Sequence, residues 1–518
     1  MAFLSTINRR FLEAVSHLLY ANPFLQEMVN FEREALRGAA IKEDALWSAN
    51  VSDPDRVRAN TWLIMKRLTP LLKTLRDDLA HGRAAADESE LLLYEDGLLY
   101  YFYYKHYEQF VHATFHGKGR DRERWAFYRD FLEEWKHYFQ IANLKLPTEH
   151  QARHTFACYY QVVRGFHHIF DQIIGSSQPA ARLRAAVWQS VFTHDIRRYR
   201  RTLYGRMSEF ATLITGPSGT GKELVARSIA MSRYVPFDEN KLAFEEDLPG
   251  LFFPINIAAL PGPLVESELF GHKRGSFTGA VQDKRGWLEA CPPLGAVFLD
   301  EIGELDLAIQ VKLLRVIETR SFQAVGEGSA QLHKFEGKLI AATNQNLERS
   351  IRKRAFREDL YYRLCSDQIA TPSLRQQIDE SPGVLRDLIL FMALRVAGTE
   401  GASLADEAVS WIEANLGSEY GWPGNYRELE QCVRNILIRK DYHPHLKPAR
   451  GGKKSDLFAG AREGTLTANE LLNRYCTLVY AQTGSYEETA RRLEIDRRTV
   501  KAKVDETLLT SLRRIPQS

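Results

Sequence analysis

The chain has 518 residues, too many for one hydrophobic core, and 44% of them are hydrophobic, so we expect about three globular domains and exclude a disordered scaffold. The formal net charge of +3 is small for this length, so any nucleic-acid binding must come from a local basic patch. Five cysteines without CxxC spacing indicate reduced thiols rather than disulfides or a zinc site. Because neither a signal sequence nor a run of 18 apolar residues is found, we expect a cytoplasmic protein that does not enter a membrane.

The N-terminal part of the chain has a helical pattern, with apolar residues three and four positions apart and little strand-like alternation. It predicts an all-helical domain over residues 1–185. His150 and His154 are four positions apart, so one helix face could present both to a metal ion. Without further ligands in the pattern, ordinary packing is the favoured interpretation of this pair.

The pattern changes after residue 200 to short apolar runs that end in glycine or charged residues. The runs at 211–214, 296–299 and 338–342 predict buried parallel strands, because helical stretches separate them. Residues 379–442 are helical again, and 443–464 contain prolines, glycines and few apolar residues, as is typical of a linker.

A glycine-rich segment follows the first of these predicted strands and precedes a helix. In that context the backbone N–H groups bind phosphates, while glycines permit close approach and positive φ. Lys222 would contact the β and γ phosphates of ATP, and Glu223 stands where Ser or Thr usually helps to hold magnesium. The residues expected to bind the nucleotide here are Gly216, Pro217, Ser218, Gly219, Thr220, Gly221, Lys222 and Glu223.

Polar residues also follow the other two predicted strands. Asp300 and Glu301 would supply a magnesium-linked acid and a water-polarising base. Asn344 would lie beside the γ phosphate, although such a residue taken alone is more often part of a turn. Arg357 and Arg363 are candidates for an arginine finger across a subunit boundary, although single arginines are usually surface residues.

With these elements in order, residues 213–431 strongly resemble the central domain of the sigma-54-dependent transcription activators of bacteria, the enhancer-binding proteins. The G-T-G-K-E sequence that ends at Glu223 is the usual form in that family. Further matching motifs are E-S-E-L-F-G-H at 266–272, Q-V-K-L-L-R at 310–315, F-R-E-D-L-Y-Y-R at 356–363 and W-P-G-N-Y-R-E-L at 422–429.

The resemblance implies a role for each matching residue. Lys222, Asp300 and Glu301 serve hydrolysis of ATP with Mg²⁺, which Asp300 helps to hold. Asn256 couples the nucleotide to a moving loop, and Asn344 is the sensor. The other implied residues are Arg357 and Arg363, acting in trans within a homo-oligomer expected to be a hexamer, and Arg427, the lid arginine that contacts nucleotide.

The segment from Gly275 to Ala280 resembles the loop that these ATPases push into the sigma factor. The family usually has Ala at its second position, where this chain has Ser276. An ordinary glycine-rich hairpin tip is the alternative interpretation. The residues of this predicted partner loop are Gly275, Ser276, Phe277, Thr278, Gly279 and Ala280.

The C-terminal segment predicts two helices in a helix-turn-helix arrangement. The sequence S-Y-E-E at 485–488 predicts a capping box for a helix through Leu493, and Asp496 can cap a second helix through Val504. Glu494 occupies the turn, where glycine is frequent. The segment resembles the Fis-type domain of these activators, although such helices are often only a solvated basic face. The residues expected to contact double-stranded DNA are Arg491, Arg492, Arg497, Arg498, Thr499, Lys501 and Lys503.

The implied fold is multidomain: an all-α N-terminal domain, an α/β AAA+ P-loop ATPase with a helical lid, and a C-terminal all-α helix-turn-helix. The predicted segments are a regulatory domain over 1–185, the ATPase core over 186–378, the lid over 379–442, a linker over 443–464 and the DNA-binding domain over 465–518. Residues 1–185 resemble no typical sensor domain closely enough to name. The sequence therefore leaves open the inducing signal, whether this domain represses or promotes ring assembly, the ring size, the DNA target and the regulated genes.

The favoured function is ATP-dependent activation of sigma-54 RNA polymerase, in which the protein binds upstream DNA and remodels the closed promoter complex. Ser276 and the unfamiliar N-terminal domain motivate an alternative: an ATPase of the same build that represses transcription or remodels another partner. A ligand or metal sensor with a vestigial ATPase is disfavoured by the complete set of hydrolysis residues.

Overall fold

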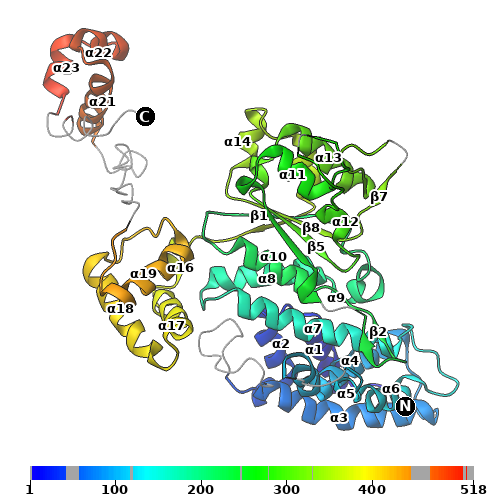
Figure 1. The fold of residues 1–518 in the computed structure, drawn as a ribbon. Coiled ribbons are helices and arrows are strands. Elements are labelled where there is room, and N and C mark those ends of the chain that lie inside the picture. Colours follow the sequence, from blue (N-terminus) through cyan, green and yellow to red (C-terminus); the bar gives the residue numbers. More distant parts are fainter. Residues whose placement is uncertain are drawn as a thin grey trace. The chain divides into compact units, whose positions relative to one another are not determined.

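The computed structural model describes residues 3–42, 58–116, 121–245, 248–277, 279–328, 331–444 and 467–505, together with residue 509. The chain forms two compact units, one of residues 1–418 with 424–442 and one of residues 419–423 with 443–518. The first unit contains the N-terminal helices, the parallel sheet and its helical lid (Figure 1). The second unit contains the last three helices that the structure describes.

The described N-terminal residues are helical up to residue 203. Helix α4 (Glu88–Val111) is the central one, because it contacts α1, α3, α6 and α7 and is buried around most of its circumference. A capping box between Asp87 and Glu90 fixes its start. The other elements are α1 (Thr6–Tyr20), α2 (Glu27–Leu36), η1 (Arg37–Ala39), α3 (Ala59–Ala80), η2 (His112–His116), α5 (Asp121–Arg124), α6 (Tyr128–Phe139), α7 (Ala152–Gln172), α8 (Gln178–Phe192), α9 (Ile196–Arg198) and η3 (Tyr199–Leu203).

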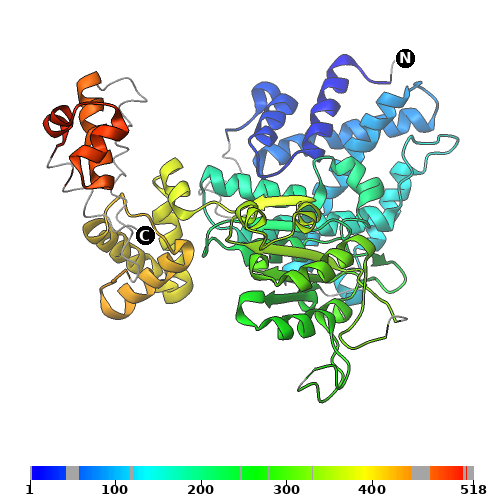
Figure 2. The same ribbon diagram turned by 90° about the horizontal axis from the view of Figure 1, so that it is seen from above.

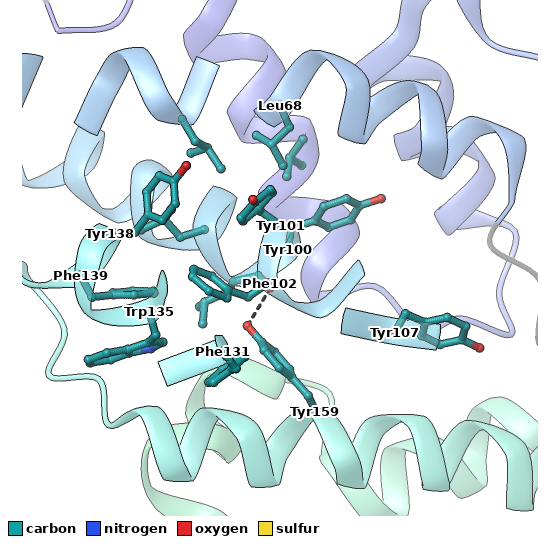
Figure 3. Packing of buried hydrophobic residues seen from close by; sticks show 14 of the residues in the cluster. Leu68, Tyr100, Tyr101, Phe102, Tyr107, Phe131, Trp135, Tyr138, Phe139 and Tyr159 are labelled. Carbon is teal, nitrogen blue, oxygen red and sulfur yellow. Dashed lines mark hydrogen bonds between the residues drawn. The ribbon is translucent and has the colours of Figure 1, made fainter. Parts of the chain in front are cut away.

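The core of these helices is unusually aromatic (Figure 3). Phe102 of α4 and Phe131 of α6 are fully buried and meet edge to face, with ring centroids 5.4 Å apart. Tyr159 of α7 donates a hydrogen bond from its hydroxyl to the carbonyl of Leu99, at 2.8 Å. Aromatic side chains bury a large apolar area and can still pair their polar groups, so they supply much of the packing that holds the bundle together.

The rings of His150 and His154 both make contacts within the protein. Both ring nitrogens of His154 have hydrogen-bond partners, the hydroxyl of Tyr234 and the carbonyl of Arg200, each at 2.8 Å. The His150 ring lies 3.3 Å from the carboxylate of Glu95, and burial lowers the pKa of both histidines. Within the described residues no group of three or more His, Cys, Asp or Glu side chains is placed to hold a metal ion.

A parallel five-stranded sheet of order β4-β5-β8-β1-β9 follows the helices. The three predicted strands are confirmed as β1 (Thr212–Thr215), β5 (Ala296–Asp300) and β8 (Lys338–Thr343), and they occupy the centre of the sheet. The sequence pattern missed both edge strands, β4 (Phe252–Asn256) and β9 (Asp367–Ala370). Each is interrupted by proline or polar residues, which edge strands tolerate because only one side of the strand is hydrogen-bonded.

Helices cover both faces of the sheet (Figure 1). The helix after β1, α10 (Lys222–Met231), packs on one face with α8, and the other face is covered by α11 (Gly262–Phe270), α13 (Leu307–Thr319) and α15 (Glu358–Leu364). Side chains along each central strand alternate between the two faces, as Leu213 and Ile214 do. The shorter elements are β2 (Phe237–Asp238), β3 (Ala243–Phe244), η4 (Leu248–Leu251), η5 (Ile257–Ala259), α12 (Trp287–Ala290), η6 (Ile302–Glu304), β6 (Ser321–Phe322), β7 (His333–Lys334) and α14 (Leu347–Arg352).

The N-terminal helices pack directly on the sheet layer (Figure 2). Helix α7 contacts α10 along its length, and a Cβ on Gly165 of α7 would lie 3.1 Å from the ring of Phe192 in α8. The predicted domain boundary after residue 185 falls inside α8. Because α8 also contacts α10 and β9, the N-terminal part and the sheet layer share one continuous packing.

The helices after the sheet are α16 (Leu374–Glu380), α17 (Val384–Ala397), η7 (Gly398–Glu400), α18 (Gly401–Asn415) and α19 (Asn425–Arg439). Residues Val384–Asn415 are long and apolar enough, at a mean hydropathy of 1.4, to pass as a membrane span on composition. They form two helices that pack against each other and against α19, with a turn at Gly398 (φ +56°) between them. About two fifths of this apolar stretch (39%) is buried by that packing.

The second unit holds α21 (Ala468–Thr483), α22 (Tyr486–Leu493) and α23 (Arg497–Lys503), each in contact with the other two. Ser485 accepts a hydrogen bond from the N–H of Glu488, but the predicted capping box is wrong in its second half, because the Glu488 carboxylate binds Arg491 and Arg492 instead. Glu494 ends α22 at φ +54°, the left-handed conformation for which glycine is usually selected. Most of the predicted linker, from residue 445 onward, lies outside the described residues.

Candidate nucleotide site and partner loop

The glycine-rich loop connects the central strand β1 to α10. Gly216 and Gly219 have φ of +150° and +78°. A Cβ on Gly216 would lie 2.1 Å from Oγ1 of Thr371, and one on Gly219 would lie 2.3 Å from the carbonyl oxygen of Gly424. Neither position accepts a side chain, so the two glycines are required both for the path of the loop and for the close approach of the lid.

The amine of Lys222 lies inside the curve of this loop. Its Nζ donates to the carbonyl oxygens of Gly216 and Pro217 at 3.1 and 3.4 Å and lies 4.0 Å from Oε1 of Glu301. Burial lowers the pKa of Lys222, although the neighbouring carboxylates of Glu301 and Asp300 oppose that shift. A buried ammonium held by carbonyls and carboxylates suits the binding of a polyphosphate.

The predicted polar residues converge at the carboxyl ends of the strands. Asn256 ends β4 and is in register with Asp300 at the end of β5. The next residue, Glu301, has φ +56°, an unfavourable backbone conformation for a residue other than glycine. Its Oε2 accepts a hydrogen bond from the N–H of Asn344 at 3.1 Å, so the end of β8 helps to orient this carboxylate.

A cavity of about 550 Å³ joins the loop to these strand ends. Its lining includes Lys222, Asn256, Asp300 and Glu301, but not Asn344, which reaches the site through its bond to Glu301. The volume is typical of a site for a small molecule or cofactor.

The apolar walls of this cavity come from residues that the sequence pattern did not mark. Ile173, Ile174 and Leu183 line it from the segment of α7 and α8, and Phe391 and Met392 line it from α17 of the lid. Each of them is an ordinary apolar helix-associated residue in the sequence. Only the packing of α7, α8 and the lid around the loop brings these residues together.

The lid is tied to the glycine-rich loop through the start of α19. The N–H of Tyr426 donates to the carbonyl of Gly219 at 3.1 Å, and Nδ2 of Asn425 donates to that of Ser218 at 2.9 Å. Arg427 reaches the hydroxyl of Ser218 at 3.4 Å and lines the cavity. The structure thus brings the predicted lid arginine to the predicted phosphate loop.

The two predicted trans-acting arginines do not line the cavity of their own chain. Arg357 is bonded to Asp359 by two contacts of 3.0 and 2.6 Å, and Arg363 is bonded to Glu318 at 3.1 Å. Their side chains are 40% and 58% exposed. A role in hydrolysis for either arginine therefore requires a second subunit, and it stays a prediction.

The two ends of the predicted partner loop are joined by a 2.9 Å hydrogen bond from the N–H of Gly275 to the carbonyl of Ala280. The ring of Phe277 meets that of His272 edge to face, with centroids 4.9 Å apart. The hydroxyl of Ser276 is buried and has no hydrogen-bond partner within the described residues. Thr278 lies outside them.

The base of the partner loop is joined to the segment between β6 and β7. Lys273 donates its N–H to the carbonyl of Val325 at 2.9 Å, and its amine lies 3.4 Å from the Glu327 carboxylate. That carboxylate also binds His333 at 2.9 Å. Burial raises the pKa of Glu327, but the hydrogen bond from the N–H of Ala324 and the contacts with His333 and Lys273 outweigh it and lower the pKa. The same contacts hold the two segments together.

In the second unit, the predicted DNA-contacting arginines are exposed, but most have carboxylate partners. Arg491 and Arg492 bind Glu488, and Arg497 binds Glu487 at 2.9 Å. Arg498 and Lys501, in contrast, form no ion pair within the described residues. The other two predicted contacts, Thr499 and Lys503, are half-buried. The positive charge that is not neutralised locally therefore lies on α23.

The parallel sheet, the phosphate-type loop after its central strand, the carboxylates at the next strand ends and the helical lid define an ATPase domain of the AAA+ class. Residues 192–370 match the Sigma-54 interaction domain family. The predicted resemblance to sigma-54-dependent activators is confirmed by this match and by the relatives.

Three relatives are regulators of bacterial origin. The chain is 38% identical over 276 residues to the Nif-specific regulatory protein of Enterobacter agglomerans (52% of this chain, 45% of that one). It is 41% identical over 238 residues to the DNA-binding transcriptional regulator NtrC of Proteus hauseri, covering 46% of each chain. Against the regulatory protein LuxO of Vibrio cholerae it is 38% identical over 240 residues (46% of this chain, 48% of that one).

The matched region spans less than half the length of these relatives. Among solved structures, NtrX from Brucella abortus aligns over 74% of this chain and 80% of its own, with 23% identity and a TM-score of 0.38. A score of that size adds nothing to the fold described above.

Proposed function

We propose that the protein is an ATP-dependent activator of sigma-54 RNA polymerase that binds upstream DNA and uses ATP hydrolysis to remodel the closed promoter complex. The observation that carries this proposal is the presence, in one Sigma-54 interaction domain, of a cavity with Lys222, Asp300 and Glu301 and of the G-S-F-T-G-A segment at 275–280. The first supports hydrolysis and the second supports engagement of the sigma factor.

In this proposal each residue at the strand ends has one role in hydrolysis. Lys222 binds the β and γ phosphates, and Glu301, oriented by the N–H of Asn344, takes up the proton of the attacking water. Asp300 would hold Mg²⁺, since its carboxylate offers the oxygen ligands that this ion prefers. The metal supplies charge neutralisation on the phosphates when it is bound.

In this proposal Asn256 couples hydrolysis to the partner loop. From Asn256 the chain runs through η5 and α11, which ends at Phe270 shortly before the loop begins at Gly275. Asn256 lines the nucleotide cavity, so a change there has a short path to the loop. Arg357 and Arg363 act on the nucleotide of a neighbouring subunit, which makes a homo-oligomeric ring, expected to be a hexamer, the active form.

The test is promoter melting. The full chain is mixed with sigma-54 RNA polymerase on a supercoiled sigma-54 promoter, and unpaired thymines are mapped with permanganate. We expect melting with ATP and none with a non-hydrolysable analogue. ATP hydrolysis without melting would instead favour the second candidate, an ATPase with another partner, for which Ser276 at the position of the family's Ala is the specific observation.

Removal of residues 1–185 is expected to weaken nucleotide binding at least tenfold, because it removes α7, part of α8 and the cavity wall of Ile173 and Leu183. ADP binding is measured by calorimetry on the truncated and full chains. Ile174→Ala in the full chain should weaken binding in the same direction, since it shortens the same wall without removing a helix. Unchanged ADP affinity in both variants would show that the N-terminal helices do not form part of the site.

We also propose that the N-terminal helices regulate the motor. Such control requires that the contacts between these helices and the motor differ in energy between the assembled ring and the unassembled subunit. A signal then alters this difference. The packing of α7 on α10 offers the contact through which that difference acts.

Removal of residues 465–518 is expected to weaken binding to duplex DNA and to leave the rate of ATP hydrolysis within about twofold. In the intact chain the duplex affinity should fall steeply as salt rises, because phosphate contacts release counterions. Fluorescence anisotropy with labelled duplex at two salt concentrations measures this. Arg498→Ala should weaken binding, whereas Arg434→Ala, a surface arginine of α19 paired with Glu430, should not. Equal duplex affinity with and without 465–518 would place the DNA site elsewhere.

A further inference from the structure

A second cavity, of about 150 Å³, lies among the N-terminal helices and shares no lining residue with the nucleotide cavity. Its walls come from α1, α4, α7 and α8 and are mostly aliphatic and aromatic, as with Leu19, Tyr103, Val162 and Trp188. Figure 3 shows three further wall residues, Tyr100, Tyr107 and Tyr159, on facing helices. An apolar hollow of this kind is exceptional in an otherwise close-packed core.

Two polar groups on the cavity walls have no hydrogen bond within the described residues. The Trp188 side chain is 4% exposed, and its indole N–H is buried without a partner. The Nε–H of Arg200, which also lines the cavity, is likewise buried without a partner in the described part of the chain. Other hydroxyls of the lining are satisfied by protein groups, as that of Tyr159 is by the Leu99 carbonyl and that of Tyr199 is by Gln161. Buried donors normally have partners, so the two exceptions point to a group that is supplied from outside the chain.

We propose that this cavity binds a small molecule with one aromatic ring and one hydrogen-bond acceptor. A volume of about 150 Å³ with mostly apolar walls is the size that accepts a benzene-like ring. Aromatic walls provide offset and edge-to-face contacts for the ring. The Trp188 N–H and the Arg200 Nε–H select for the acceptor, and the half-buried hydroxyl of Tyr103, which bonds to no described residue, is a further donor on the wall.

The cavity is linked to the motor through α7. Gln161, on the cavity wall, donates from Nε2 to the carbonyl of Ser232 at 2.9 Å. Ser232 is the C-terminal cap of α10, the helix that begins at Lys222. The hydroxyl of Ser228 in α10 also donates to the carbonyl of His168 in α7, at 3.2 Å. A ligand that favours one position of α7 therefore biases the helix that carries the phosphate-binding lysine.

The binding test uses the full chain, with phenol as the probe and calorimetry as the measurement. Val162→Phe and Leu19→Phe fill the cavity from α7 and α1, and each is expected to weaken phenol binding at least tenfold. Val311→Phe is the control, because it also replaces valine by phenylalanine but at an exposed position of α13. Its phenol affinity should stay within about twofold of the wild type. No phenol binding by the wild type, or equal binding by both filled variants, would overturn the proposal.

A hydroxyl deletion tests the polar part without altering the shape of the cavity. Tyr103→Phe should weaken phenol binding about fivefold and leave toluene binding within about twofold, because toluene has no acceptor. Tyr160→Phe, on α7 but outside the lining, should change neither. Equal losses for phenol and toluene in Tyr103→Phe would rule out selection for an acceptor.

The link to the motor rests on the proposed function and has its own measurement. Saturating phenol is expected to change the ATPase rate of the wild type at least twofold and that of Val162→Phe not at all. An inactive ATPase in a chain that still binds phenol would reject the proposed function and leave the site in place. If phenol binds but leaves the rate of an active ATPase unchanged, the link through α7 is rejected.

Discussion

Glu301→Gln is expected to lower the ATPase rate at least tenfold, about 1.4 kcal/mol in the barrier, while ATP still binds. The glutamine amide oxygen can still accept the N–H of Asn344, so the strand ends keep their arrangement. What is lost is the carboxylate that accepts the proton of water. Loss of a negative charge 4.0 Å from the Lys222 amine leaves that amine free for phosphate, so binding should not weaken. Steady-state turnover and nucleotide affinity are measured separately.

The matched control is Glu304→Gln. Glu304 lies three residues further along the chain, and its carboxylate accepts a 2.6 Å hydrogen bond from Gln345 outside the nucleotide cavity. Its replacement should leave turnover within about twofold of the wild type. If Glu301→Gln turned over like the wild type, Glu301 would have no part in the chemical step.

Phe277→Ala is expected to reduce open-complex formation at least tenfold while the ATPase rate changes less than twofold. The Phe277 ring packs on His272 at the edge of the domain and is absent from the nucleotide cavity. Its loss therefore removes surface from the loop that engages the partner, and not from the hydrolysis site. Thr278→Ala is expected to act in the same way. Permanganate mapping of the promoter and phosphate release give the two readouts.

Val281→Ala is the control for the partner loop, since its side chain is 80% exposed and lies just outside the six-residue segment. It should leave both readouts within about threefold of the wild type. Ser276→Ala should keep or raise open-complex formation, because it removes a buried hydroxyl without a hydrogen-bond partner. Normal promoter melting by Phe277→Ala would favour a partner other than sigma-54.

The sequence by itself determined the chemistry of the ATPase domain. Gly216 to Glu223, Asp300, Glu301 and Asn344 follow three apolar runs, and parallel strands bring their carboxyl ends to one edge. Local spacing is therefore enough to predict that these residues meet. The central strands were predictable for the same reason, because burial on both faces requires continuous apolar residues.

Only the tertiary structure decided which residues complete the site and where the N-terminal helices belong. Ile173, Ile174 and Leu183 are apolar residues of a helical stretch, and nothing in their spacing distinguishes a core position from the wall of a nucleotide cavity. The same holds for the second cavity, whose wall residues lie far apart in the chain, from α1 to η3. Long-range packing sets these neighbours, and helical periodicity reports only which face of a helix is buried, not what it is buried against.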